Sequence, residues 1–262
     1  MFGFVSCSLN ASYTQILLSF AALFIAYVMI VCWMGYYRAW IANKMGDSSA
    51  ADAGFLTLNP RKQVSMQGLF TLLLFRFGWG ATQPHRPTTI TSTAQVAGDQ
   101  INQPSPVADH SMWTKLFVAY LSSPLLHVAA AIFDMIILLA IFGKNIVALA
   151  DTAMLHGNFS HSALWSMYPT HSGITVFIAL ILIFSIYIHV FSAVFNCLFR
   201  GSKIFMIYLA EKSPRFALYH NFAKIFLGVV VVLFFLTPQI RFLLVNFVSY
   251  ISLLIARLIG VV

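Results

Sequence analysis

Five apolar stretches, each about long enough to cross a bilayer, dominate this chain of 262 residues. A membrane-spanning helix needs about 20 consecutive, mainly apolar residues, and the qualifying stretches cover residues 15–37, 116–142, 174–199, 217–237 and 241–260. Only 8% of the residues are charged, against roughly a quarter in an ordinary soluble domain. The sequence therefore predicts an all-α, multi-pass membrane protein with a single membrane domain over residues 1–262, and it excludes a soluble, disordered or coiled-coil chain.

A sixth apolar run, Val64–Gly80, is shorter and contains several glycines, which suits a re-entrant segment better than a lipid-facing helix. Basic residues support this interpretation, because cytoplasmic loops carry the excess of Lys and Arg. Residues 38–62 contain four Lys or Arg residues and residues 200–224 contain five, whereas residues 1–14 and 145–173 contain none. We therefore predict five spans, an N-terminus on the outer side, and a sixth run that dips into the membrane and returns.

Two connecting segments and the net charge complete this topology. Residues 81–112 are rich in Thr, Gln, Ser and Pro and predict a polar cytoplasmic loop, whereas residues 143–173 predict an external loop. The net charge is +8, but the 15 Lys and Arg residues are scattered along the chain. They are topology signals, and no nucleic-acid partner is predicted.

The segment that follows the first apolar stretch contains a motif. Residues 33–47 read Trp-Met-Gly-Tyr-Tyr-Arg-Ala-Trp-Ile-Ala-Asn-Lys-Met-Gly-Asp, and residues 54–60 read Gly-Phe-Leu-Thr-Leu-Asn-Pro. This resembles the site-2 protease family of membrane-embedded zinc metallopeptidases, in which a helix with His-Glu-x-x-His runs into Ala-Trp, a basic residue, Gly-Asp, and then Gly-Arg-Leu-Thr-Leu-Asn-Pro. In the register set by the shared residues, Met34 stands for the first histidine, Gly35 for the glutamate and Arg38 for the second histidine.

Further blocks of the resemblance follow in the family's order, at Phe77-Gly78-Trp79, at Ser122-Ser123-Pro124-Leu125 and at residues 194–204. In the last block, Arg200 stands where the family has the aspartate that is its third zinc ligand. The resemblance covers residues 34–204 in separated blocks. It implies a site-2-protease-like fold with short β-structure around residues 54–80 that can accept an extended partner.

The residues at these four positions do not suit zinc hydrolysis. A zinc peptidase needs two imidazoles at i and i+4, a third ligand, and a carboxylate that takes a proton from the bound water. Met34 offers a weak thioether ligand, Gly35 offers no side chain, and Arg38 and Arg200 are permanent cations that repel a metal dication. We therefore predict no catalytic residue, no metal and no cofactor.

The substitutions have two alternative explanations. They are either drift in an unused site or a change from a metal site to an anion site. In the second case, membrane lipids or an acidic partner would be bound by the basic residues Arg38, Arg200, Lys203 and Arg76.

Polar residues inside the apolar stretches form a second candidate group. His127 and Asp134 are seven residues apart and share one helix face, and His189 lies in the middle of the next stretch. The alternatives are a relocated metal or proton site, or a buried hydrogen-bonded cluster that joins two helices, with Asp134 paired to Arg76.

The leading functional hypothesis is a catalytically inactive, site-2-protease-like membrane protein. It would act as a binding or structural subunit, or as an adaptor, and its partners would be other membrane proteins of a complex and membrane lipids. The alternatives are a divergent intramembrane zinc metalloprotease with relocated ligands and a proton or ion transport subunit that uses the intramembrane Asp and His residues.

Overall fold

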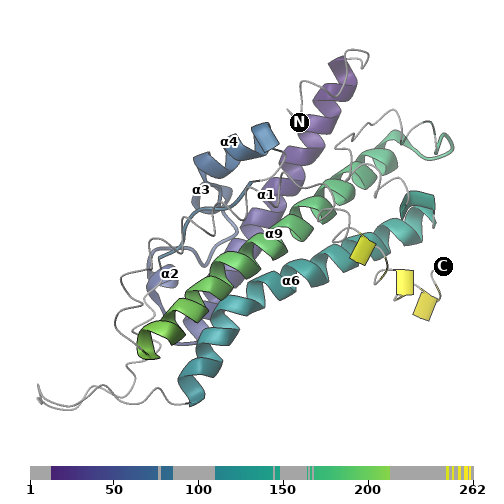
Figure 1. Ribbon diagram of the computed structural model, residues 1–262. Helices are drawn as coiled ribbons and strands as arrows, with labels where there is room; N and C mark the ends of the chain where they lie inside the picture. The colour runs from purple at the N-terminus through teal and green to yellow at the C-terminus, as the bar shows by residue number, and fades with distance from the viewer. Residues whose placement is uncertain are drawn as a thin grey trace, which may run out of the picture.

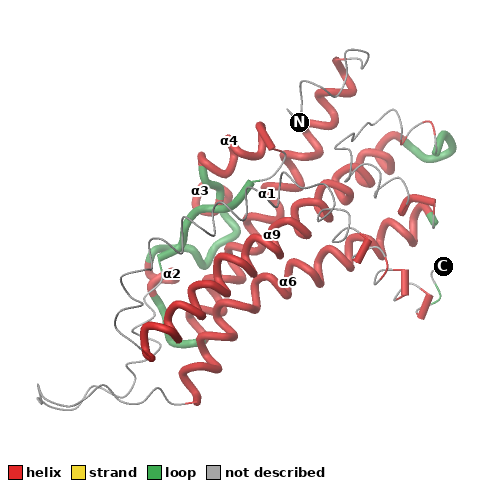
Figure 2. Tube along the Cα trace, viewed as in Figure 1, coloured by secondary structure: helices red, strands yellow, loops and turns green. Residues whose placement is uncertain are grey.

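The computed structural model describes residues 13–75, 78–84, 110–143, 145–147, 164, 166 and 168–212, together with isolated positions between 246 and 260. Three long helices form the body of this part of the chain: α1 (Tyr13–Lys44), α6 (His110–Phe142) and α9 (Gly173–Lys212). They run side by side as an elongated bundle (Figures 1 and 2). Helix α9 is central, because it packs against both α1 and α6, which contact each other much less.

The three helices are long and apolar enough to cross a membrane, over Ile16–Lys44, Phe117–Phe142 and Gly173–Gly201. A helix of 29 residues is about 43 Å long, more than the roughly 30 Å hydrocarbon thickness of a bilayer. The structure thus confirms an all-α membrane protein and three of the predicted stretches. Of the other two, residues 217–237 lie outside the described residues and residues 241–260 are described only at isolated positions, so five spans remain a prediction, as does the outer N-terminus.

All three long helices extend beyond the stretches predicted from apolar composition. Helix α1 continues to Lys44, and α9 continues to Lys212, because a helix does not end where its apolar surface ends. Helix α6 begins at His110, within the segment 81–112 that was predicted to be a loop.

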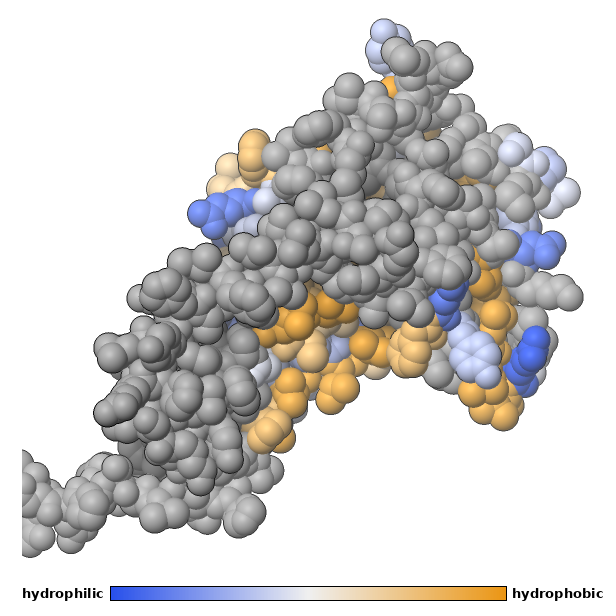
Figure 3. All heavy atoms as spheres, viewed as in Figure 1, coloured by the Kyte–Doolittle hydropathy of each residue, from blue (hydrophilic) through white to orange (hydrophobic). Residues whose placement is uncertain are grey.

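Small residues allow the three helices to pack closely. Ala22 and Ala26 of α1, Ala131 of α6 and Ala179 of α9 are all buried, and small side chains let helix backbones approach in a membrane. Large apolar residues fill the remaining space; those that are almost fully buried include Leu23, Tyr27, Met135, Leu138, Leu180, Phe184 and Phe191. Other apolar side chains gather on the outer surface of the bundle (Figure 3), as expected for helices that face lipid.

Three short helices connect α1 to the rest of the described chain: α2 (Ser49–Asp52), α3 (Pro60–Gln63) and α4 (Met66–Phe75). The sequence Asn59-Pro60 starts α3, because Asn59 Oδ1 accepts a hydrogen bond from the Arg61 backbone N–H at 3.0 Å and proline suits the first helical position. Helix α4 has ten residues and is about 15 Å long, so it cannot cross a bilayer by itself.

The predicted re-entrant run begins and ends at the same place. Val64 and Gly80 pair in an isolated antiparallel bridge, and the Ala81 N–H donates to the Gln63 carbonyl at 2.7 Å. The run therefore leaves this point through α4 and returns to it. The short β-structure expected here is limited, among the described residues, to this single bridge.

Candidate binding site

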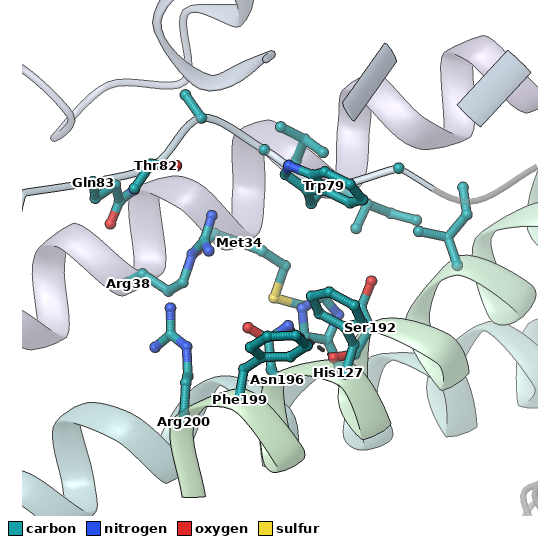
Figure 4. A pocket seen from close by; sticks show the side chains of 17 residues that line it. Met34, Arg38, Trp79, Thr82, Gln83, His127, Ser192, Asn196, Phe199 and Arg200 are labelled. Carbon is teal, nitrogen blue, oxygen red and sulfur yellow. Dashed lines mark hydrogen bonds between the residues drawn. The ribbon is translucent and has the colours of Figure 1, made fainter. Parts of the chain in front are cut away.

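A cavity of about 270 Å³ lies where α1, α6, α9 and the returning segment 78–83 meet. Each wall comes from a different part of the chain: α1 supplies four residues, α9 supplies six, the returning segment supplies six, and His127 comes from α6. Figure 4 shows the main side chains, which include Met34, Arg38, Trp79, Thr82, Gln83, His127, Ser192, Asn196, Phe199 and Arg200.

Three of the four positions singled out by the motif line this cavity. Met34 and Arg38 are four residues apart, so they lie one above the other on the same face of α1. The Arg38 Nε–H donates to the Met34 carbonyl at 3.2 Å, which holds the guanidinium along the helix. Arg200 enters from α9 and points toward the Arg38 side chain, whereas the Arg38 guanidinium turns toward the returning segment (Figure 4).

The fourth position, Gly35, is buried against α3 rather than open to the cavity. A Cβ atom built on Gly35 would lie 1.9 Å from Gln63 Oε1. Gln63 is fully buried, and its Nε2 donates to the carbonyls of Phe55 at 2.8 Å and Thr57 at 2.9 Å. The amide of Gln63 therefore occupies the space into which any side chain at position 35 would extend.

A second glutamine, Gln83, contacts the carbonyl of the same glycine. Gln83 Nε2 donates to the Gly35 carbonyl at 2.6 Å, and this hydrogen bond ties the returning segment to α1. The sequence analysis missed both Gln63 and Gln83. Each is an isolated polar residue outside the long helices, and neither belongs to a motif or a periodic pattern, so their contacts with Gly35 depend on the tertiary structure alone.

The predicted group of intramembrane polar residues divides into two contacts. His127 Nδ1 lies 2.9 Å from His189 Nδ1, which requires that one ring donate its proton and the other accept it. Asp134 is not part of this pair, because it accepts a hydrogen bond from Ser185 Oγ at 2.6 Å. Both contacts join α6 to α9. Within the described part of the chain, no three His, Cys, Asp or Glu side chains are placed together so that they could hold a metal ion.

Two basic residues of the predicted set cannot be assigned to the cavity. Arg76 lies outside the described residues, and so does its predicted contact with Asp134. Lys203 lies on α9, about one turn beyond Arg200, but its side chain is not described.

The histidine contact predicts a measurable coupling between α6 and α9. We expect His127→Leu to destabilise the protein by about 1–3 kcal/mol, because it leaves a buried nitrogen of His189 without its partner. His189→Leu should have a similar effect. The double variant should lose less than the sum of the two, which thermal unfolding of the three variants in detergent would show. Strictly additive losses would mean that the two rings do not interact.

The cavity offers positive charge and hydrogen-bond donors. None of the described residues that line it is Asp or Glu, whereas Arg38 and Arg200 each carry up to five guanidinium N–H donors. Such a donor set suits an anion. It does not fit a zinc ion, which needs imidazole, thiolate or carboxylate ligands with free lone pairs.

Comparison of this chain with models of protein families, with curated proteins and with solved structures gave no match.

Proposed function

We propose that this protein is a catalytically inactive, site-2-protease-like membrane protein that acts as a binding or structural subunit, or as an adaptor, in a complex of membrane proteins. The observation that supports the proposal is the cavity in which Met34, Arg38 and Arg200 meet, with the amide of Gln63 over Gly35. Under the resemblance, catalysis would need two histidines, a glutamate and an aspartate. This chain has none of these residues at the four corresponding positions.

Metal-assisted hydrolysis needs both ligands and a base. Guanidinium groups have no lone pair to offer a metal, and a thioether is a weak ligand for zinc. A base at position 35 has no room, because even a methyl group there would overlap Gln63. What remains is a shaped and positively charged cavity between membrane-spanning helices, which is a binding property.

The returning segment has exposed residues at the wall of the cavity. Thr82 and Pro84 are exposed, whereas Gln83 between them is buried against α1. An extended segment anchored in this way can pair with an extended stretch of another chain. The partner is therefore expected to lie against residues 78–84.

Site-specific photocrosslinking tests this function. A photoreactive phenylalanine analogue at Thr82, which is exposed and lines the cavity, should crosslink one discrete membrane protein in intact membranes. The matched control is the same analogue at Leu17, which is 67% exposed near the beginning of α1. Crosslinking of the same proteins from both positions, or of no protein from Thr82, would contradict the proposal.

A further inference from the structure

Arg38 and Arg200 form an unusual pair of like charges at the wall of the cavity. The Arg200 guanidinium points from α9 toward the Arg38 side chain, whereas the Arg38 guanidinium turns toward Gly80 of the returning segment (Figure 4), and both residues are partly buried. The two charges interact, and like charges repel more strongly away from bulk water. An anion in the cavity that contacts both arginines would turn this repulsion into two attractive contacts.

The acidic side chains that the structure describes do not supply that anion. Asp47 accepts hydrogen bonds from the backbone N–H and the hydroxyl of Ser49, and Asp52 accepts one from Ser48 Oγ at 2.7 Å. Asp134 accepts one from Ser185, and none of the three lines the cavity. Among the described side chains, no carboxylate at the cavity balances the two arginines, and an anionic ligand would supply this charge.

Charge and geometry indicate which anion fits. Guanidinium groups bind phosphate oxygens through two parallel hydrogen bonds. A phosphate monoester carries a charge of about −1.5 to −2 at neutral pH, which matches two guanidiniums, whereas a single carboxylate would leave one of them unbalanced. The volume of about 270 Å³ is small for a ligand site, which suits a phosphate group with a short attachment rather than a large ligand.

The two arginines lie near the ends of their candidate membrane spans. Arg38 is six residues before the end of the span Ile16–Lys44, and Arg200 is one residue before the end of the span Gly173–Gly201. Helix ends of this kind reach the level of the lipid headgroups, where basic pockets between helices bind phosphorylated headgroups. Thr82, exposed at the cavity, adds a neutral hydroxyl donor.

We propose that Arg38 and Arg200 form a binding site for a phosphate dianion, either the monoester headgroup of phosphatidic acid or free inorganic phosphate. The site rests on the proposed function, because it requires that these positions hold no metal ion. The phosphate would bind in the cavity in addition to the protein partner proposed above.

Two probes distinguish the sources of the phosphate group. The full chain is purified in nanodiscs of phosphatidylcholine and titrated with inorganic phosphate by calorimetry. In parallel, nanodiscs with phosphatidic acid are compared with nanodiscs with phosphatidylglycerol, whose phosphate is a diester with one charge, and retained lipid is counted by native mass spectrometry. Retention of phosphatidic acid without binding of free phosphate assigns the site to a lipid, and the reverse assigns it to a soluble phosphate; both results support the proposal.

Substitutions then test the two arginines. Arg38→Gln and Arg200→Gln should each weaken binding about 10- to 100-fold, because a hydrogen-bonded charge is lost from the site. Arg61→Gln is the matched control, since Arg61 is exposed on α3 away from the cavity, and it should leave binding unchanged. If a glutamine variant fails to fold, Arg38→Lys and Arg200→Lys keep the charge but lose the paired donors, and they should bind measurably less tightly.

Several outcomes would overturn the site. These are no binding of either probe, equal binding by the folded arginine variants and the unaltered chain, and competition by succinate as effective as that by phosphate. The last result would assign the cavity to an acidic side chain of a protein partner. Zinc is measured in the same preparations: stoichiometric zinc refutes the proposed function itself, whereas failed phosphate binding in a zinc-free protein refutes only the phosphate site.

Discussion

A variant that combines Met34→His, Arg38→His and Arg200→Asp is expected to bind zinc at least about 100-fold more tightly than the unaltered chain. Positions 34 and 38 share one face of α1 and line the same cavity as position 200 of α9. Two imidazoles at i and i+4 and a carboxylate from a facing helix form a usual zinc ligand set. The same three changes remove the two cations that repel the metal. Competition with a chromogenic chelator would measure the gain.

A matched control uses two outward-facing positions of the same helix. Met29→His with Trp33→His also places imidazoles at i and i+4, but these positions are 63% and 58% exposed and have no third ligand. The control should bind zinc only weakly. Equal zinc affinity in the two variants would show that Met34, Arg38 and Arg200 do not converge. The zinc-binding variant should still not hydrolyse peptides, because position 35 has neither a carboxylate nor room for one.

Gly35→Ala is expected to destabilise the protein by about 1–4 kcal/mol, although alanine favours a helix more than glycine does. The new methyl group would overlap the Gln63 amide. That amide cannot move without breaking its hydrogen bonds to the carbonyls of Phe55 and Thr57, which costs about 1–3 kcal/mol for each buried group left unpaired. Thermal unfolding in detergent measures the loss.

Two further variants isolate the cause of this effect. Gly201→Ala is the control, because a Cβ at that helical position meets no neighbouring atom of the described residues within 4 Å, and it should be neutral or slightly stabilising. Gln63→Ala removes the amide, so Gly35→Ala should cost much less in that background than in the unaltered chain. If Gly35→Ala is as stable as Gly201→Ala, the close approach of Gln63 to α1 is wrong.

The apolar stretches predicted the three long helices, because a helix that crosses a membrane needs about 20 mainly apolar residues. That reasoning identified α1, α6 and α9, but it did not predict that α9 lies between the other two, which depends on how small residues such as Ala131 and Ala179 pack. Nor did it find the continuation of α9 to Lys212, since the polar end of a helix has no apolar signal.

The candidate site was only partly predictable for similar reasons. The spacing of Met34 and Arg38 places them on one face of any helix. That Arg200 of α9 lies at the same cavity could be predicted only from the family resemblance. His127 and Asp134 also share a face, but seven residues separate them by about 10.5 Å along the axis, too far for one small site. This explains why His189 contacts His127 while Asp134 pairs with Ser185.

The metal content of the unaltered protein tests the central claim most directly. The full chain is purified from membranes in zinc-containing medium, dialysed against a weak chelator and measured by elemental mass spectrometry. Because Arg38 and Arg200 stand at the cavity where ligands would be needed, we predict far less than one zinc ion per chain, and no change when both arginines are replaced by glutamine. One tightly held zinc ion per chain would contradict the account of this cavity as an inactive binding site.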